Sequence, residues 1–194
     1  MYEGIFGVAS IHSGSFVCNP ENLIGSVIIE QEVFVAPMAV IRADECGPFR
    51  ICRGTNIQDL AILHGLADHY VVVDGHRYSI YIGSHCSITH RALIHGPCKI
   101  GKKTFVGFSA IVYHSNIGVH CHIGLGAIVR DVTIADGRYV EDGLVVNSQK
   151  VADSLPPNKS ENGDFNRKVV DCNKKLFRKY KSATETIKSQ TPDI

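Results

Sequence analysis

Residues 82–112 read IGSHCSITHRALIHGPCKIGKKTFVGFSAIV, and this stretch decides the fold. An aliphatic residue returns at every sixth position, and a small residue follows it four places later. The aliphatic positions are Ile82, Ile88, Ile94, Ile100, Val106 and Val112, and the small ones are Cys86, Ala92, Cys98, Thr104 and Ala110. Exposed strands alternate with period two and amphipathic helices with period 3.6, so neither explains a strict six. A six-residue repeat is a sequence sign of a parallel β-helix.

The same spacing continues on both sides of this stretch, and every position on it is Ile, Val or Leu. These positions are Ile11, Val17, Leu23, Ile29, Val35 and Ile41, then Ile51, Ile57 and Leu63, and finally Ile117, Ile123, Val129, Ile134, Val140 and Val146. Insertions at residues 42–50 and 64–81 interrupt the phase, and insertions in a solenoid become external loops that often build sites. We predict an all-β solenoid over residues 1–155. Resemblance to hexapeptide-repeat proteins implies a left-handed parallel β-helix with three hexads per turn.

The repeat ends at Leu155, and residues 156–194 are predicted to form a linker, an α-helix and a tail. Apolar residues recur there at helical spacing, and Asp164 is a candidate N-cap. This face is predicted to pack along the β-helix, whereas the chain from residue 182 onward is predicted to fray. The predicted packing face consists of Phe165, Val169, Cys172, Leu176 and Tyr180.

Composition excludes several classes of function. The formal net charge of +1 gives no electrostatic reason to expect nucleic acid or an anionic membrane as a partner. The first twelve residues do not resemble a secretory signal, and no apolar run reaches the roughly 20 residues of a spanning helix. Seven cysteines at no CxxC spacing indicate reduced thiols and a cytoplasmic protein. Cys86, Cys98 and Cys121 occupy small core positions and are predicted to be buried structural thiols.

Two histidines share one phase of the repeat. His64 follows the core position Leu63, and His95 follows Ile94. Without the excess residues of the second insertion they are one turn of a three-sided coil apart, so they should stack on adjacent rungs about 4.8 Å apart. Imidazoles at that spacing can share one metal ion.

His90 lies on the preceding face of the coil, five residues before His95. An extended segment of that length spans about 16 Å, too far for both side chains to reach one ion within a subunit. If His90 is a ligand, it must come from a neighbouring chain, which predicts a cyclic trimer with interfacial sites. The alternative is that these histidines are hydrogen-bonded structural residues, as isolated histidines often are.

Several motifs resemble the γ-class carbonic anhydrases in order and spacing. They are IRADE at residues 41–45, TNIQD at 55–59, ILHG at 62–65 and ITHRALIHGP at 88–97, and the match runs on through GRYV (137–140) and SQ (148–149) to VDCN (170–173). The segment YSIYIG at 78–83 is most similar to the carbonic-anhydrase-like domain of a carboxysome scaffold protein. The resemblance covers nearly the whole chain.

This resemblance implies reversible hydration of carbon dioxide to bicarbonate in a homotrimer. His64, His90 and His95 would hold Zn²⁺, with Fe²⁺ or Co²⁺ as alternatives. Three histidines leave an open coordination position, which is typical of catalytic zinc. The remaining implied roles are orientation of the hydroxide by Gln58, a substrate pocket containing Asn56 and Asn173, proton relay by Glu45, and an intersubunit ion pair between Arg42 and Asp59.

The loop after the first ligand histidine departs from the archaeal enzymes, because GLADH at residues 65–69 contains no glutamate. Proton export would then depend on Asp68, His69, Glu45 or buffer, since imidazole titrates near neutral pH. Two other functions compete with an active carbonic anhydrase. One is a catalytically silent metal-binding or scaffold homologue, for which carboxysome components are candidate partners. The other is a hexapeptide-repeat acyltransferase, which shares the fold but needs no three-histidine metal site.

Overall fold

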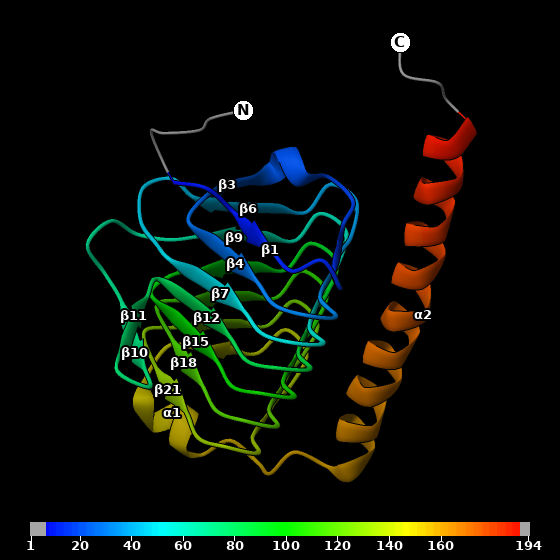
Figure 1. The fold of residues 1–194 in the computed structure, drawn as a ribbon. Coiled ribbons are helices and arrows are strands. Elements are labelled where there is room, and N and C mark those ends of the chain that lie inside the picture. The colour runs from blue at the N-terminus through cyan, green and yellow to red at the C-terminus, as the bar shows by residue number, and fades with distance from the viewer. Residues whose placement is uncertain (1–6, 191–194) are drawn as a thin grey trace.

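The computed structural model describes residues 7–190 as a left-handed parallel β-helix flanked by a long helix (Figure 1). The coil has three flat sides, each a seven-stranded parallel sheet. Sheet A contains β1 (Ser10–Ile11), β4 (Val27–Ile29), β7 (Phe49–Ile51), β12 (Ile80–Ile82), β15 (Cys98–Ile100), β18 (Asn116–Ile117) and β21 (Thr133–Ile134). Sheet B contains β2 (Phe16–Val17), β5 (Phe34–Val35), β8 (Asn56–Ile57), β13 (Ser87–Ile88), β16 (Phe105–Val106), β19 (His122–Ile123) and β22 (Tyr139–Val140).

Sheet C completes the triangular cross-section of the coil. It contains β3 (Leu23–Gly25), β6 (Val40–Ala43), β9 (Ile62–His64), β14 (Leu93–His95), β17 (Ile111–Tyr113), β20 (Ile128–Arg130) and β23 (Val145–Val146). A short 3₁₀ helix, η1 (Pro20–Asn22), precedes β3. Each strand pairs with the equivalent strand one turn away, so side chains at one repeat position form a ladder along the coil.

The core is the ladder of aliphatic residues that the six-residue period predicts. Every predicted core position is buried except Ile11, which is 40% exposed on the first strand of the coil. The small positions Cys86, Ala92, Cys98, Thr104 and Ala110 are also buried. Some corners of the coil leave no room for a side chain and therefore require glycine. A Cβ added to Gly101 would lie 2.4 Å from the backbone carbonyl carbon of Gly118 on the next rung. The predicted fold class is therefore confirmed.

The second insertion contains an antiparallel hairpin that sequence periodicity did not predict. Its strands are β10 (Val71–Val73) and β11 (His76–Tyr78), which leave the coil beside sheet A (Figure 1). The insertion begins at His64 and ends where β12 rejoins the core. The hairpin thus leaves the register of the coil unchanged on either side.

Two helices follow the last strand, α1 (Gln149–Asp153) and α2 (Ser160–Gln190). The prediction of Asp164 as the N-cap is wrong, because α2 begins at Ser160, and the predicted fraying from Ser182 is wrong as far as Gln190. The last four residues, 191–194, lie outside the described residues. Within the described part of the chain, no helix has the length and apolarity needed to cross a membrane. The division of the chain into units at residue 155 remains a prediction.

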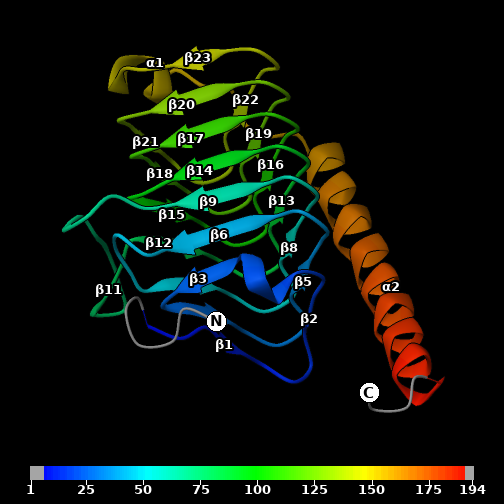
Figure 2. The same cartoon turned by 90° about the horizontal axis from the view of Figure 1, so that it is seen from above.

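Helix α2 lies along sheet B, where it contacts β2, β5 and β13 (Figure 2). The predicted packing face is displaced by one residue. Cys172 is exposed, whereas Asn166, Val170 and Asn173 are buried. Hydrogen bonds cause this displacement, because the Asn166 amide donates to the carbonyls of His85 and Lys103, at 3.1 and 3.2 Å. A pattern of apolar residues does not predict that an asparagine side chain attaches the helix to the coil.

The core ladder makes a quantitative prediction about stability. Val106→Ala, at a completely buried position, should lower the free energy of unfolding by about 2 kcal/mol, since two methylene equivalents are lost and a cavity remains. Val72→Ala is the matched control, because Val72 is 65% exposed in the hairpin. Urea denaturation measures both variants. Equal losses would contradict the assignment of Val106 to the core.

Candidate metal centre

His64 and His95 lie side by side at the end of adjacent strands of sheet C. β9 and β14 pair in parallel with His64 directly opposite His95, and their ring centroids are 5.3 Å apart. Both rings point away from the core, because each follows an inward aliphatic residue. The structure thus brings together two of the three predicted ligands on one outer edge of the coil.

Acidic and basic side chains surround His64. Arg42 is opposite His64 on β6, and its Nη2 lies 3.3 Å from His64 Nε2. The same imidazole nitrogen lies 3.7 Å from carboxylate oxygens of Asp44 and Glu45. Arg42 also pairs with Asp44 through its Nε at 3.1 Å. Metal binding at His64 Nε2 would have to displace the Arg42 guanidinium.

Three further rings extend this edge beyond His95. Tyr113 is opposite His95 on β17, at a centroid distance of 5.3 Å, and stacks on His114 at 3.8 Å. His114 lies 5.9 Å from His95 and 6.4 Å from the exposed ring of His69. Burial lowers the pKa of His114, and its Nε2 has no hydrogen-bond partner within the described residues. Sequence reasoning missed His114 and Tyr113, although an 18-residue step from His95 leads to Tyr113.

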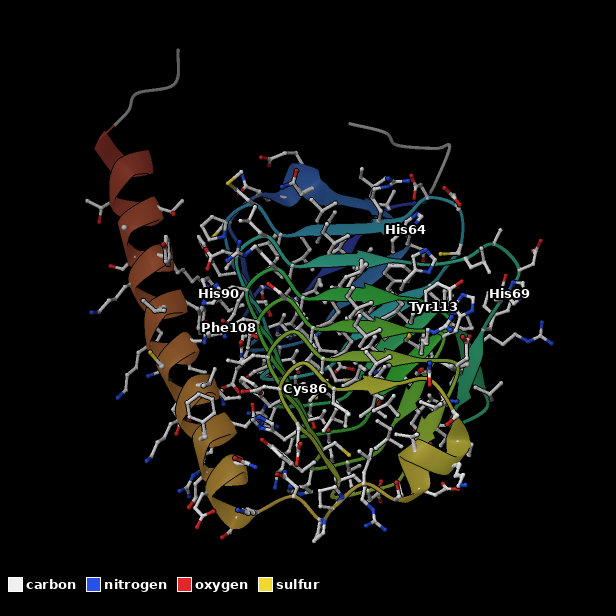
Figure 3. All side chains as sticks on the ribbon, turned by 180° about the vertical axis from the view of Figure 1, so that it is seen from behind. His64, His69, Cys86, His90, Phe108 and Tyr113 are labelled. Carbon is white, nitrogen blue, oxygen red and sulfur yellow. The ribbon has the colours of Figure 1, made fainter. Side chains whose placement is uncertain are left out.

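His90 lies at the opposite edge of sheet C, in the turn between β13 and β14. Figure 3 shows His90 and Phe108 at one end of the strands, and His64, Tyr113 and His69 at the other. His90 Nδ1 is 2.9 Å from the Asp59 carboxylate, and its ring is 5.1 Å from that of Phe108. The His90 side chain is 47% exposed, so it is open to an additional partner.

The predicted polar residues Gln58 and Asn56 lie on the same side of the coil as His90. Gln58 is adjacent to Asp59, and its Nε2 donates a hydrogen bond to Asn56 Oδ1 at 2.9 Å. The Asn56 amide in turn donates to Ser87 Oγ at 3.0 Å. Both amide side chains are buried, and these bonds fix their orientation.

Asn173, the remaining predicted site residue, lies on α2. Its side chain is buried against sheet B, and its Nδ2 donates to the Val169 carbonyl at 2.9 Å. Within the described residues no hydrogen bond joins Asn173 to any of the three predicted ligand histidines. Its predicted place in a substrate pocket therefore remains a prediction.

The predicted site residues thus form two half-sites on opposite edges of sheet C. His64, His95, Arg42 and Glu45 form one. His90, Asp59 and Gln58, at the corner between sheets B and C, form the other together with Asn56, which precedes this corner on β8. Across residues 7–190, no group of three histidine, cysteine or acidic side chains is close enough to hold a metal ion. Arg42 and Asp59 fall in different half-sites, so they cannot pair within one chain.

The outer face of sheet C carries an uncovered aliphatic ladder between the two half-sites. One in-register row consists of Val40, Ile62, Leu93, Ile111, Ile128 and Val145. Ile62 and Val145 are 44% and 46% exposed, and the others are half-buried. The corresponding row on sheet A is mostly polar, and α2 covers sheet B. Sheet C is therefore the side of the coil with apolar surface left to bury.

The cysteines form no part of either ligand set. All seven are free, and Cys86, Cys98 and Cys121 are buried at small core positions, as predicted. Burial raises the pKa of the Cys86 and Cys98 thiols to about 12. These thiols remain protonated and are poor nucleophiles at neutral pH.

Comparison with curated proteins gives two groups of relatives. The chain is 40% identical to the carboxysome assembly protein CcmM of Nostoc sp. over 179 residues, 92% of this chain and 32% of that protein. It is 41% identical to a carbonic anhydrase of Methanosarcina thermophila over 145 residues, 70% of this chain and 59% of that enzyme. The chain thus spans less than two thirds of the length of either relative.

Similar solved structures support the fold. A hexapeptide transferase family protein from Anaplasma phagocytophilum superposes with a TM-score of 0.71 at 21% identity, covering 89% of this chain and 92% of that one. A Bacillus cereus protein described as a putative acetyltransferase superposes with a TM-score of 0.68 at 20% identity, covering 91% and 94%. At such identities the similarity concerns the fold alone. No family model matches the sequence. The two curated relatives, however, show that the chain belongs to the family of the γ-class carbonic anhydrases and their carbonic-anhydrase-like carboxysome homologues.

Proposed function

We propose that this chain is a metal-dependent carbonic anhydrase that interconverts carbon dioxide and bicarbonate at sites shared between the subunits of a homotrimer. The observation that carries the proposal is the division of the predicted site into two half-sites on opposite edges of sheet C. Each half is incomplete in one chain, and each contains what the other lacks.

Assembly through sheet C would join the two halves. A contact between the His90 edge of one copy and the His64 edge of the next uses two different surfaces, so it repeats until a ring closes. Asp59 is paired with His90, and Gln58 is adjacent to it. The copy that supplies His90 would therefore also bring Asp59 toward Arg42, which would form the predicted intersubunit ion pair. The aliphatic ladder supplies apolar area to bury in such a contact.

The donor set suits a divalent transition metal, with zinc proposed and iron or cobalt as alternatives. His64 and His95 of one chain and His90 of the next would be three neutral imidazole ligands. When bound, the metal would lower the pKa of a coordinated water to about 7 and so supply hydroxide at neutral pH. If the Arg42 side chain paired with Asp59 of the neighbouring chain, its guanidinium would move away from His64 Nε2.

The protein's own groups would orient the reactants. Asn56 holds the Gln58 amide at a fixed position, from which Gln58 would orient the nucleophilic oxygen through a hydrogen bond. Glu45 is exposed beside His64 and would accept a proton there. Asn173 would line the substrate pocket from α2. His69 would carry protons to solvent, because its exposed imidazole stacks on the His114 ring next to His95.

One alternative function has specific support. The match to CcmM covers 92% of this chain, so a catalytically silent metal-binding or carboxysome scaffold homologue is the second candidate. Carboxysome components would then be the partners. The acyltransferase alternative rests on fold similarity alone, which does not specify chemistry.

The central prediction concerns complementation between inactive variants. His90→Ala and His95→Ala should each lower carbon dioxide hydration, measured by stopped flow, at least about 100-fold, because each removes a metal ligand. Mixed and reassembled in equal amounts, the two variants should recover about a quarter of wild-type activity, since one interface in four combines two intact halves. Metal content per chain should recover in parallel.

The same experiment separates the competing hypotheses. Activity without complementation would contradict a shared site. If mixing the variants restored metal binding but no activity appeared, the silent homologue would be favoured. If the wild-type protein had no bound metal and no activity, the proposal would be contradicted altogether.

The second prediction concerns the assembly surface. Ile111→Asp places a carboxylate in the aliphatic ladder, and burying it unpaired in an interface is costly, so the trimer should dissociate. The matched control is Ile28→Asp, an outward aliphatic position on sheet A. Light scattering after gel filtration gives the mass of each variant. A trimer that persists in Ile111→Asp would show that sheet C is not the interface.

The third prediction tests proton export by His69. In weakly buffered solution His69→Ala should lower kcat about tenfold or more and leave kcat/KM nearly unchanged, since proton export follows attack on carbon dioxide. Added imidazole should restore kcat. His76→Ala, in the exposed hairpin, is the control. An unchanged kcat would assign proton export to Asp68, Glu45 or buffer.

A further inference from the structure

A buried serine hydroxyl connects the two insertions at the corner between sheets C and A. Ser79 is completely buried and directly precedes the core position Ile80. Its Oγ accepts a hydrogen bond from the Gly47 amide of the first insertion, at 3.1 Å. The same hydroxyl donates to the His69 carbonyl of the second insertion, at 3.3 Å. One side chain thus binds both insertions at a single point.

The coil itself does not require the Ser79 hydroxyl. The parallel pairing of β12 with β7 and β15 places Pro48 and Pro97 at the positions that correspond to Ser79 on the neighbouring rungs. Proline has no side-chain hydroxyl, and both neighbouring rungs keep their register without one. The hydroxyl of Ser79 therefore serves the insertions and not the repeat.

The bond from Ser79 ends at the backbone of His69, whose exposed imidazole is the proposed route for protons to solvent. The ring Nδ1 lies 2.6 Å from the Ala67 carbonyl, which can only accept a hydrogen bond. In the neutral ring Nδ1 therefore carries the hydrogen, and Nε2 has the lone pair that accepts a proton. The ring stacks on His114 at a centroid distance of 6.4 Å and an interplanar angle of 11°.

The segment 65–69 has few other attachments. The His69 amide donates to the Leu66 carbonyl, and the His69 ring bonds to Ala67, so both of these bonds stay inside the segment. Within residues 7–190, the bond from Ser79 is the only hydrogen bond that joins His69 to a residue outside it. The position of the imidazole thus depends on the buried hydroxyl.

We propose that Ser79 is a positioning residue for proton export, because its hydroxyl fixes the His69 backbone against the first insertion and so keeps the imidazole beside His114. Without the hydroxyl, the Gly47 amide loses its acceptor and the segment 65–69 loses its bond to the coil. That segment then opens more often, and His69 spends less time beside the metal centre. The effect on turnover rests on the proposed carbonic anhydrase activity, whereas the connection between the insertions does not.

Ser79→Ala in the full-length protein tests the kinetic consequence. In weakly buffered solution kcat for carbon dioxide hydration should fall about fivefold, the factor expected for one hydrogen bond, while kcat/KM and metal content stay near wild type. Added imidazole should restore kcat. The double variant Ser79→Ala/His69→Ala should be no slower than His69→Ala alone, because Ser79 acts only through His69.

Ser15→Ala is the matched control. Ser15 is a buried serine at the corner between sheets A and B, and its Oγ likewise accepts from one backbone amide, that of Val33, and donates to one carbonyl, that of Glu30. Its loss removes the same number of bonds away from both half-sites, so kcat should not change. A kcat/KM or metal content that falls together with kcat in Ser79→Ala would overturn the proposal, and so would additive losses in the double variant.

Backbone amide hydrogen exchange, followed by mass spectrometry, tests the connection without reference to activity. Exchange in residues 44–47 and 65–70 should be faster in Ser79→Ala than in the wild type, and unchanged in Ser15→Ala. Unchanged exchange in Ser79→Ala would overturn the proposal. An inactive wild-type protein whose exchange responds as expected would contradict the proposed function and the kinetic role of Ser79, and would support only the connection between the insertions.

Discussion

The constraint on which this structure depends is the in-register stacking of short parallel strands around a narrow core. The coil encloses one aliphatic side chain per hexad, and only a small residue fits at the following corner. Each rung must therefore repeat the one below, because otherwise the aliphatic side chains of neighbouring rungs would no longer pack against each other. This requirement orders the interior and also every row of side chains outside it.

Register turns spacing in the sequence into position in space. His64 and His95 are neighbours because each follows a core residue, and the hairpin of the second insertion leaves that phase intact. The same register keeps His90 away, since it belongs to the turn on the other edge of sheet C. A coil built from strands of two to four residues cannot fold these edges together, so one chain brings only part of the predicted ligand set to each edge.

The six-residue repeat made much of the fold and part of the candidate site predictable from the sequence. The core positions, the buried cysteines, the pairing of His64 with His95 and the separation of His90 from both all followed from counting in sixes. The predictions failed where packing does not use aliphatic periodicity. Helix α2 turns by one residue because Asn166 binds carbonyls at the corner turns, and the hydropathy of the helix contains no signal for those bonds. Tyr113 and His114 lie one rung beyond His95, outside the motifs that resemble the family, so the resemblance does not mark them.

The three sides of the coil have different surfaces, and this difference connects the fold to the proposed chemistry. Sheet A presents a mostly polar row, α2 covers sheet B, and sheet C leaves an aliphatic row open between the two half-sites. A metal ion bound by both halves would bind the assembled ring and not the separate chains, so metal binding and assembly would stabilise each other by mass action. The apolar contact and the metal would then act together: hydrophobic burial would bring the edges into register, and the ion would hold them there. A site divided in this way makes the geometry of the active centre a property of the assembly, with the rigid coil fixing each half in advance.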